Sequence, residues 1–530
     1  PVAGITGLLL LLQATGVVGW DAAAHLYKIA LLRDHRSIIW DNSWYGGAYS
    51  IISYGVVFYY LAQFVSYTLL VGVSTGLLPL FFYLYFRRVY GVESYVPSIV
   101  LAVVLALYLA NGQDPFLFAM SFVMLGMVLV AYDRPLLAAL PLAVALFANP
   151  LAIVVAAIFL SADFIARPER RRLYLRLALY MAPFAAAKAV LMVLFAEASS
   201  YVYYAPQVLL FAGFGLSGFA MARMSRDPER RAKEVLFLTF TAVAVATVLV
   251  PGNPLGGNVG RIFFLFGVPL LLSVRRVYLP KFLVVPIIVG FAVGQVAAPA
   301  RHYVHVADLP STKAPFFAPA LQFAGTHYDP NFRFHVVALD THWEAYYFSI
   351  NDYLITRGWY RQQDAVHNDI FATKTFTAGQ YVAWLRAMGA KYVFLPKAPL
   401  DISGAREARL LATTPAFTAV YDGPQWTVYR LAGPQPIAVP ARPGDSIKVV
   451  YVDHGSVFFD VGRPGTYLVK ISYSPYWQVT NGLGTLSESQ DGFVLLHAQE
   501  RGFYGMRVQV DLQSLGQVVE ERLALRSPGE

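Results

Sequence analysis

The chain has 530 residues, of which 57% are hydrophobic and only 14% are charged, and its mean hydropathy is +0.51. Soluble proteins average about 25% charged residues, so this composition indicates an integral membrane protein. The formal net charge is +9, but the basic residues gather in short loops between apolar runs. This placement is typical of the positive-inside rule and excludes nucleic acid as a partner. The absence of cysteine excludes disulfides and thiolate metal sites.

The first apolar run covers about residues 5–18 and is expected to be a short, retained membrane helix. An amphipathic stretch follows it, in which Asp21, His25 and Lys28 share one face of a predicted helix. A carboxylate held at the membrane surface beside an imidazole and an ammonium can act as a general base or bind a metal ion. An interfacial helix whose polar side only faces water explains the same pattern equally well.

Two aromatic segments come next. Trp44 and Tyr45 precede paired glycines, which suits a turn at the level of the lipid headgroups. Residues 54–70 are apolar but contain Gln63 and several tyrosines. If this segment crossed the membrane, every later basic loop would lie on the wrong side. We therefore expect it to be re-entrant or interfacial.

Ten further spans are expected from the apolar runs, which makes about eleven with the first run. They lie at about residues 72–86, 95–110, 116–132, 135–148, 150–165, 177–196, 206–223, 234–251, 261–274 and 282–298. The basic loops all fall on one side of this arrangement, which predicts a multi-pass protein of the plasma membrane with a cytoplasmic N-terminus. Asp21, Asp114 and Arg261 then lie on the outer side.

The sequence predicts three domains. Residues 1–299 are expected to form a transmembrane domain whose outer loop, residues 21–70, carries amphipathic helices. Residues 300–436 alternate strand-like runs with a helix, which predicts an extracytoplasmic α/β domain. Residues 437–530 show period-two strands broken by Gly, Pro and Asp, which predicts an extracytoplasmic β-sandwich or jelly roll.

Two further charged residues are candidates for the outer face. Asp114 stands in a tight turn between two spans, where it could share a cation with Asp21 or divide the base and orienting roles with it; a simple turn cap is an equal alternative. Arg261 follows the glycine-rich residues 253–260 and suits a lipid phosphate. An arginine that reaches back to the interface explains it equally well.

A polar and aromatic patch in the predicted α/β domain is a candidate sugar-binding surface. Its members are His342, Glu344, Arg357, Trp359, Tyr360, Arg361 and His367. A contact between domains explains the patch nearly as well. The sequence contains no Walker loop, dinucleotide fingerprint or nucleophile elbow, so any reaction would draw its energy from an activated substrate such as a lipid-linked donor.

Several of these segments together resemble the GT-C superfamily of membrane glycosyltransferases. The resemblance is carried by Asp21-Ala-Ala-Ala-His25-Leu-Tyr-Lys28, by Trp44-Tyr45-Gly46-Gly47, and by the aromatic segment with Tyr54 and Tyr59-Tyr60-Leu61. The turn near Asp114 and the pair Gly260-Arg261 also fit it. Within the superfamily the chain is most similar to prokaryotic membrane proteins labelled 6-pyruvoyl-tetrahydropterin synthase-related.

The resemblance implies a sugar donor on a polyprenyl phosphate or diphosphate, and a glycan, lipid or protein acceptor that enters from outside. Asp21 matches the loop aspartate that is the usual candidate base, with His25 and Asp114 assisting. Arg261 would hold the donor phosphate, and the other substrate-binding candidates are Lys28, Trp44, Tyr45, Trp359 and Arg361. The loop lacks the Asp-x-Asp of many oligosaccharyltransferases, so a need for Mg²⁺ or Mn²⁺ at Asp21 and Asp114 stays open.

Two functions follow from the sequence. The first is an inverting glycosyltransferase of the GT-C type with Asp21 as base. The second is a non-catalytic membrane protein of the cell envelope whose outer domains bind glycan or a partner subunit. A transporter is less favoured, because the unusual polar residues gather at the outer face and not near the middle of the membrane.

Overall fold

The computed structural model describes residues 3–4, 7–8, 10–11, 19–52, 54–196, 205–250, 256–307, 309–360, 363–364, 368–372 and 375–524. The chain forms two compact units, which we call the helical unit and the mixed unit. The helical unit comprises Pro1–Ala22, Tyr54–Val190 and Ser200–Asp308. The mixed unit comprises Ala23–Ser53, Leu191–Ser199 and Leu309–Glu530. This division differs from the expected ranges, because most of the first loop belongs to the mixed unit.

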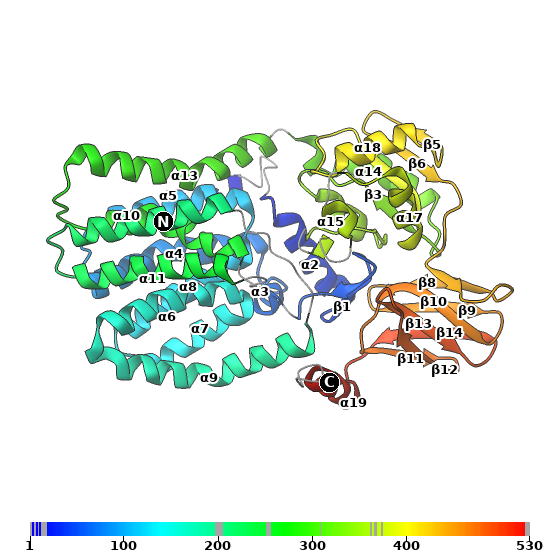
Figure 1. Cartoon of the computed structure of the whole chain (residues 1–530), viewed down its shortest axis with the longest axis horizontal. Coiled ribbons are helices and arrows are strands. Elements are labelled where there is room, and N and C mark those ends of the chain that lie inside the picture. The colour runs from blue at the N-terminus through cyan, green and yellow to red at the C-terminus, as the bar shows by residue number, and fades with distance from the viewer. Residues whose placement is uncertain are drawn as a thin grey trace. The chain divides into compact units, whose positions relative to one another are not determined.

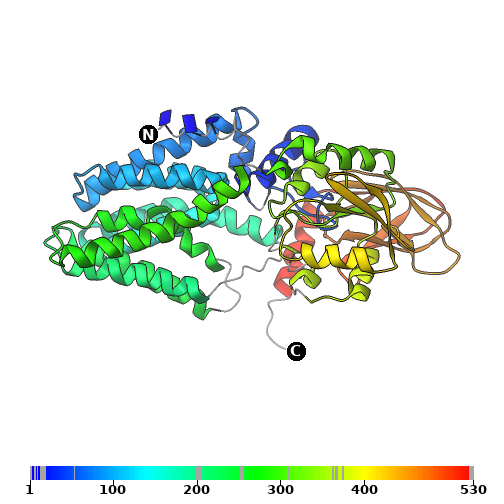
Figure 2. The ribbon, with the colours of Figure 1, turned by 90° about the horizontal axis from the view of Figure 1, so that it is seen from above.

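The helical unit is a bundle of apolar helices (Figures 1 and 2). Its helices are α3 (Val56–Leu61), α4 (Tyr67–Tyr90), α5 (Val96–Tyr108), α6 (Asp114–Ala131), α7 (Pro135–Ala148), α8 (Pro150–Ala166), most of α9 (Arg171–Leu194), α10 (Ala205–Arg223), α11 (Arg230–Leu249), α12 (Arg261–Leu272) and α13 (Lys281–Ala307). Helix α6 packs against both α4 and α7, and α11 packs against α8 and α10.

Four of the described helical segments are long and apolar enough to cross a membrane: Tyr67–Tyr90, Asp114–Ala131, Pro168–Leu194 and Lys281–Val306. The eleven spans expected from the sequence are therefore not found among the described residues. Helices such as α7 and α8 have 14 and 17 residues, and at 1.5 Å per residue they reach about 21–26 Å, short of a hydrocarbon core of about 30 Å. Most of the first apolar run lies outside the described residues.

The segment at residues 54–70 is not one element. Gly55, at φ 80, precedes the short helix α3, and α4 begins at Tyr67 after a break. The hydroxyl of Ser66 accepts a hydrogen bond from the amide of Leu69 at 3.3 Å and caps α4. The last residues of the segment thus form the first turn of α4. The sequence predicted that this span begins later, at about residue 72.

The mixed unit contains a four-stranded sheet of the order β3-β4-β6-β5. Its strands are β3 (Arg333–Val336), β4 (Ala390–Pro396), β5 (Phe417–Asp422) and β6 (Trp426–Leu431), and only the β3–β4 pair is parallel. Helices α14 (Ala314–Thr326), α15 (Trp343–Ser349), α17 (Ala378–Ala387) and α18 (Gly404–Thr413) accompany the sheet (Figure 1). Strands and helices thus occur together in this part of the chain, where the sequence analysis expected strand-like runs and a helix.

Two antiparallel four-stranded sheets, β12-β13-β10-β7 and β11-β14-β9-β8, follow in the chain. They comprise β7 (Ala438–Pro440), β8 (Ile447–Val452), β9 (Ser456–Val461), β10 (Gly465–Ser472), β11 (Trp477–Asn481), β12 (Gly484–Glu488), β13 (Phe493–Ala498) and β14 (Gly502–Val508), before helix α19 (Leu512–Ala524). Buried side chains of both sheets share one core, as expected for a sandwich.

The first loop completes this sandwich. It forms α2 (Ala22–His35) and a small hairpin of β1 (Trp40–Asp41) and β2 (Ala48–Tyr49). Trp40 is 4% exposed and belongs to the sandwich core, where its ring lies 5.7 Å from that of Trp477. The strand just before the aromatic turn at Trp44 and Tyr45 is therefore part of a folded core.

Candidate functional site

The first outer-face candidate, Asp21, is positioned by a close contact between two loops of the helical unit. Its amide donates a hydrogen bond to the carbonyl of Asn111 at 3.0 Å. Gly19 lies so close to Gly112 that a Cβ on Gly19 would stand 2.3 Å from the Gly112 Cα. Gly112 itself has φ 68, a conformation that favours glycine. Two glycines thus let the Asp21 loop pack on the turn that precedes Asp114.

Asp114 is the first residue of α6, and its side chain is 3% exposed. The Tyr67 hydroxyl, at the start of α4, donates a hydrogen bond to its Oδ2 atom. The Oδ1 atom is buried and has no hydrogen-bond partner within the described part of the chain. A buried carboxylate oxygen without a donor is costly, so this atom is available to a ligand.

Arg261 begins α12 and brings a positive charge close to Asp21. Its guanidinium lies 4.9 Å from the centre of the Phe116 ring, and its Nε donates to Asn258 Oδ1 at 3.2 Å. Asn258 lies in the glycine-rich turn Gly256–Gly260. The guanidinium keeps further N–H groups, and this geometry suits an anion such as a phosphate.

The charges of Arg261 and Asp114 both act on Asp21. Burial raises the pKa of the Asp21 carboxyl to about 7; Arg261 opposes this rise and Asp114 adds to it. The residue is only partly buried. A carboxyl with a pKa near neutrality and some access to solvent is suited to general-base chemistry. We call Asp21, Asp114 and Arg261 the carboxylate–arginine cluster.

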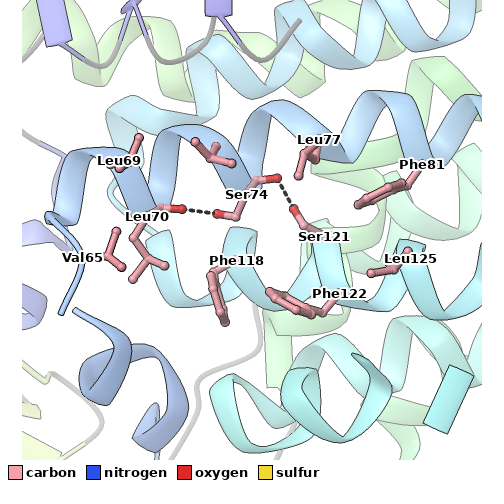
Figure 3. A pocket seen from close by; sticks show the side chains of 11 residues that line it. Val65, Leu69, Leu70, Ser74, Leu77, Phe81, Phe118, Ser121, Phe122 and Leu125 are labelled. Carbon is pink, nitrogen blue, oxygen red and sulfur yellow. Dashed lines mark hydrogen bonds between the residues drawn. The ribbon is translucent and has the colours of Figure 1, made fainter. Parts of the chain in front are cut away.

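An apolar cavity of about 370 Å³ lies between α4 and α6. Figure 3 shows aliphatic and aromatic side chains of both helices around it, with the Ser121 hydroxyl donating to the Ser74 carbonyl. The lining residues are Val65, Leu69, Leu70, Val73, Ser74, Leu77, Phe81, Phe118, Ser121, Phe122 and Leu125. The two helices begin at Tyr67 and Asp114. A long apolar ligand in this cavity would therefore lead to the carboxylate–arginine cluster.

Four other candidates pack inside the mixed unit. Lys28 is 3% exposed and lies 5.2 Å from the Trp44 ring. The Trp44 indole donates to Ser349 Oγ at 2.9 Å, and the Tyr45 hydroxyl donates to the Tyr360 carbonyl at 3.0 Å. His25 is also buried. His25 and Lys28 therefore do not lie on a solvent-facing polar surface, and the contacts of Trp44 and Tyr45 tie the first loop to the α/β part.

The predicted polar and aromatic patch is partly assembled. His342 has φ 53, its Nδ1 lies 3.4 Å from Glu344 Oε1, and its ring centre lies 6.3 Å from that of Trp359. Both His342 nitrogens, Glu344 Oε2, Thr341 Oγ1 and Trp359 Nε1 are buried and make no hydrogen bond to any described residue. Arg361 and His367 lie outside the described residues.

Arg357, a further member of the predicted patch, has a structural role. Its guanidinium donates to Asp364 at 2.7 Å and pairs with Glu407 at 3.4 Å, and all three side chains are buried. Sequence reasoning did not identify Tyr67, because one more tyrosine in an aromatic run carries no signal of its own. It also did not identify Tyr108, whose hydroxyl donates to Gln113 at 2.9 Å beside the cluster.

Comparison with protein-family models and with curated proteins gave no match. Among solved structures, the chain is similar to two cryo-EM structures of the arabinofuranosyltransferase AftD from Mycobacteria, one of them of a mutant form. The mutant has 13% sequence identity and a TM-score of 0.47, over 96% of this chain and 59% of that chain. The other has 14% identity and a TM-score of 0.46, over 97% and 57%. This chain thus spans less than two thirds of either AftD chain.

The raised pKa of Asp21 is directly measurable. We expect the carboxyl carbon of Asp21 to titrate with a pKa of about 7 in selectively ¹³C-labelled full-length protein. Arg261→Gln removes a positive charge and should raise this pKa, whereas Asp114→Asn removes a negative charge and should lower it. Arg301→Gln, an exposed change on α13, is the control and should leave it unchanged. A titration near the ordinary value of about 4 contradicts the cluster's electrostatics.

Proposed function

We propose that this chain is a membrane glycosyltransferase of the GT-C type. It would transfer a sugar from a polyprenyl phosphate or diphosphate to an extracytoplasmic glycan, lipid or protein. The observation that carries the proposal is the carboxylate–arginine cluster, because its three members come from distant parts of the chain and combine a carboxyl whose pKa is raised to about 7 with a guanidinium. The sequence resemblance to the GT-C superfamily supports the same assignment, and the 6-pyruvoyl-tetrahydropterin synthase-related label stays a prediction.

The chemistry assigns one role to each member. Asp21 takes the proton of the acceptor hydroxyl, whose oxygen forms a bond to the anomeric carbon while the bond from that carbon to the phosphate oxygen breaks. The configuration at the anomeric carbon inverts. Arg261 stabilises the negative charge of the departing phosphate, which leaves without protonation. Asp114 orients the acceptor or raises the basicity of Asp21.

The cavity between α4 and α6 is the proposed site of the polyprenyl chain. Its lining is apolar apart from two serines, as a hydrocarbon ligand requires. The donor phosphate would then lie near the helix starts, where Arg261 and the carboxylates gather. Membrane lipids would compete for the same cavity.

A divalent cation is compatible with the cluster. Asp21 and the unpartnered Oδ1 of Asp114 are oxygen ligands of the kind that Mg²⁺ and Mn²⁺ take. Such an ion would supply charge to the donor phosphate. Arg261 already supplies one positive charge at this place. The chelator experiment below therefore decides whether Arg261 acts alone or together with a divalent cation.

Asp21→Asn tests the base. The substitution keeps the shape of the side chain and removes the carboxylate, and general-base removal typically lowers a rate about 10²–10⁴-fold. We expect that loss in a transfer assay with radiolabelled polyprenyl-linked sugars and purified full-length protein in nanodiscs, repeated with a chelator. Asp133→Asn, an exposed carboxylate paired with Arg170 at 3.0 Å, is the matched control and should retain the rate. A folded Asp21→Asn variant that matches an active wild type rules out Asp21 as base.

Val73→Trp tests the lipid cavity. The indole would fill part of the apolar space between α4 and α6. We expect the KM for a long-chain polyprenyl donor to rise about tenfold, whereas the KM for a short-chain donor with the same sugar phosphate stays within about twofold, because each buried CH₂ contributes about 0.8 kcal/mol. Val103→Trp, on the exposed side of α5, is the control. Equal rises for both donors would place the lipid chain elsewhere.

A second candidate function rests on the patch at His342 and Trp359. Several of its buried polar atoms make no hydrogen bond to any described residue and suit sugar hydroxyls, and an aromatic ring lies beside them. The patch could hold the acceptor glycan of the enzyme, or the chain could be a glycan-binding protein of the cell envelope without catalysis. An inert wild type that still binds glycan would favour this second function.

Trp359→Phe tests that patch, because it keeps an aromatic ring and removes the indole N–H, which bonds to no described residue. We expect the affinity of full-length protein for polysaccharide fragments on a glycan array to fall about 3- to 10-fold, which is the loss of about one hydrogen bond. Tyr451→Phe, an exposed ring on β8, is the control and should bind as the wild type does. Equal glycan affinity in the wild type and both variants would contradict glycan binding at this patch.

A further inference from the structure

Three side chains from separate parts of the mixed unit converge on one point away from the sites described above. His35 is the last residue of α2, Asp352 follows α15, and His454 stands between β8 and β9. The Nε2 atoms of both histidines lie 3.3 Å from Asp352 Oδ1. One ligand atom from each residue lies within 4.8 Å of the other two. None of the three was singled out as a site by the sequence.

A second layer of hydrogen bonds orients His454. Its Nδ1 lies 3.1 Å from Asp41 Oδ1 and 3.0 Å from Ser43 Oγ. The Asp41 carboxylate is itself held by the Tyr27 hydroxyl, at 3.0 and 2.9 Å to its two oxygens. In the tautomer that carries the proton on Nδ1, His454 donates a hydrogen bond to Asp41, and its Nε2 lone pair faces Asp352 Oδ1. A carboxylate behind a ligating histidine is a recurrent feature of protein metal sites.

We propose that His35, Asp352 and His454 bind a divalent transition-metal ion of the zinc class. Ligand atoms at about 2.0–2.1 Å from a tetrahedral Zn²⁺ lie about 3.3 Å from one another. The two measured nitrogen–oxygen distances have this value. Two imidazoles and one carboxylate favour zinc over Mg²⁺ or Ca²⁺, which prefer oxygen ligands.

The surroundings leave room for a fourth ligand. The His454 side chain is 6% exposed, whereas those of His35 and Asp352 are 35% and 67% exposed. Water therefore reaches the open side of the cluster and completes a four-coordinate site. The ligands come from the first loop, the α/β part and the sandwich, so a bound ion would join all three parts of the mixed unit and stabilise its folded state.

The same cluster has one alternative account. A protonated His454 between Asp41 and Asp352 makes an ion pair that needs no metal. The two accounts differ in stoichiometry, because only a metal site takes up one ion per chain. This inference concerns metal binding alone, so it does not depend on the proposed glycosyltransferase activity.

Metal content decides the question. Tag-free, full-length protein in detergent is stripped with a chelator, dialysed against a small excess of Zn²⁺ over protein, and analysed for zinc. We expect about one zinc ion per wild-type chain and a loss of at least tenfold in affinity for His35→Gln and for His454→Gln. His327→Gln, an exposed histidine outside the cluster, is the control and should retain the ion. A wild type without zinc, or cluster variants that bind as the wild type does, would overturn the proposal.

Cobalt and heat give two independent readouts. Co²⁺ in the wild type should give the intense visible absorption of a four-coordinate ion, and His35→Gln should lose it. Zn²⁺ should raise the melting temperature of the wild type and of His327→Gln but not that of His35→Gln. His35 is partly exposed, so its replacement is expected to leave the metal-free melting temperature close to that of the wild type. A zinc-induced rise of equal size in all three proteins would contradict a site at His35.

Discussion

The packing of the Asp21 loop on the turn before α6 is the contact on which the proposed active site depends. Gly19 and Gly112 approach each other more closely than any side chain would permit, and the Asp21 amide bonds to the Asn111 carbonyl. Both features are backbone features, so they fix the position of Asp21 before any side chain contributes. Asp114 follows two residues after Gly112, and its charge therefore acts on Asp21. A residue larger than glycine at either position would separate the two carboxylates.

The first loop serves two purposes along its length. Asp21, at its start, belongs to the helical unit, whereas residues 23–53 belong to the mixed unit. There Trp40 completes the core of the sandwich, Trp44 and Tyr45 bond to the α/β part, and Asp41 orients His454. The expected interfacial helix is thus part of the mixed unit, and its lysine and histidine are buried there.

Local sequence patterns predicted the secondary structure and the candidate residues better than they predicted the tertiary contacts between residues. Period-two strands and turn residues located the sandwich, and the position of charges between apolar runs selected Asp21, Asp114 and Arg261. Their convergence was beyond the sequence, because it depends on the close approach of two glycines. The histidine–aspartate cluster was equally hidden, since its three residues are hundreds of positions apart and each stands alone in its segment.

The sequence predicted about eleven spans, whereas four of the described helical segments are long and apolar enough to cross a membrane. Hydropathy measures how apolar a segment is but not whether its surface meets lipid or protein. In Asp114–Ala131, 83% of the 18-residue apolar stretch is buried inside the structure. In Lys281–Val306 the buried share is 11%, although the mean hydropathies of the two stretches are nearly equal. Apolar helices of 12–17 residues, such as α7 and α12, give the same sequence signal as short spans.

In the proposed reaction, the Arg261 guanidinium both lowers the pKa of Asp21 and binds the donor phosphate. A base works best when its pKa lies near the working pH, yet burial and Asp114 both push the pKa of Asp21 upward. Arg261 limits that rise in the absence of substrate. A donor phosphate bound to Arg261 would neutralise this influence and bring a further negative charge, so the Asp21 carboxylate becomes more basic when the donor is in place. The cluster would then couple donor binding to the capture of the acceptor proton, through charges alone and without movement of the helices.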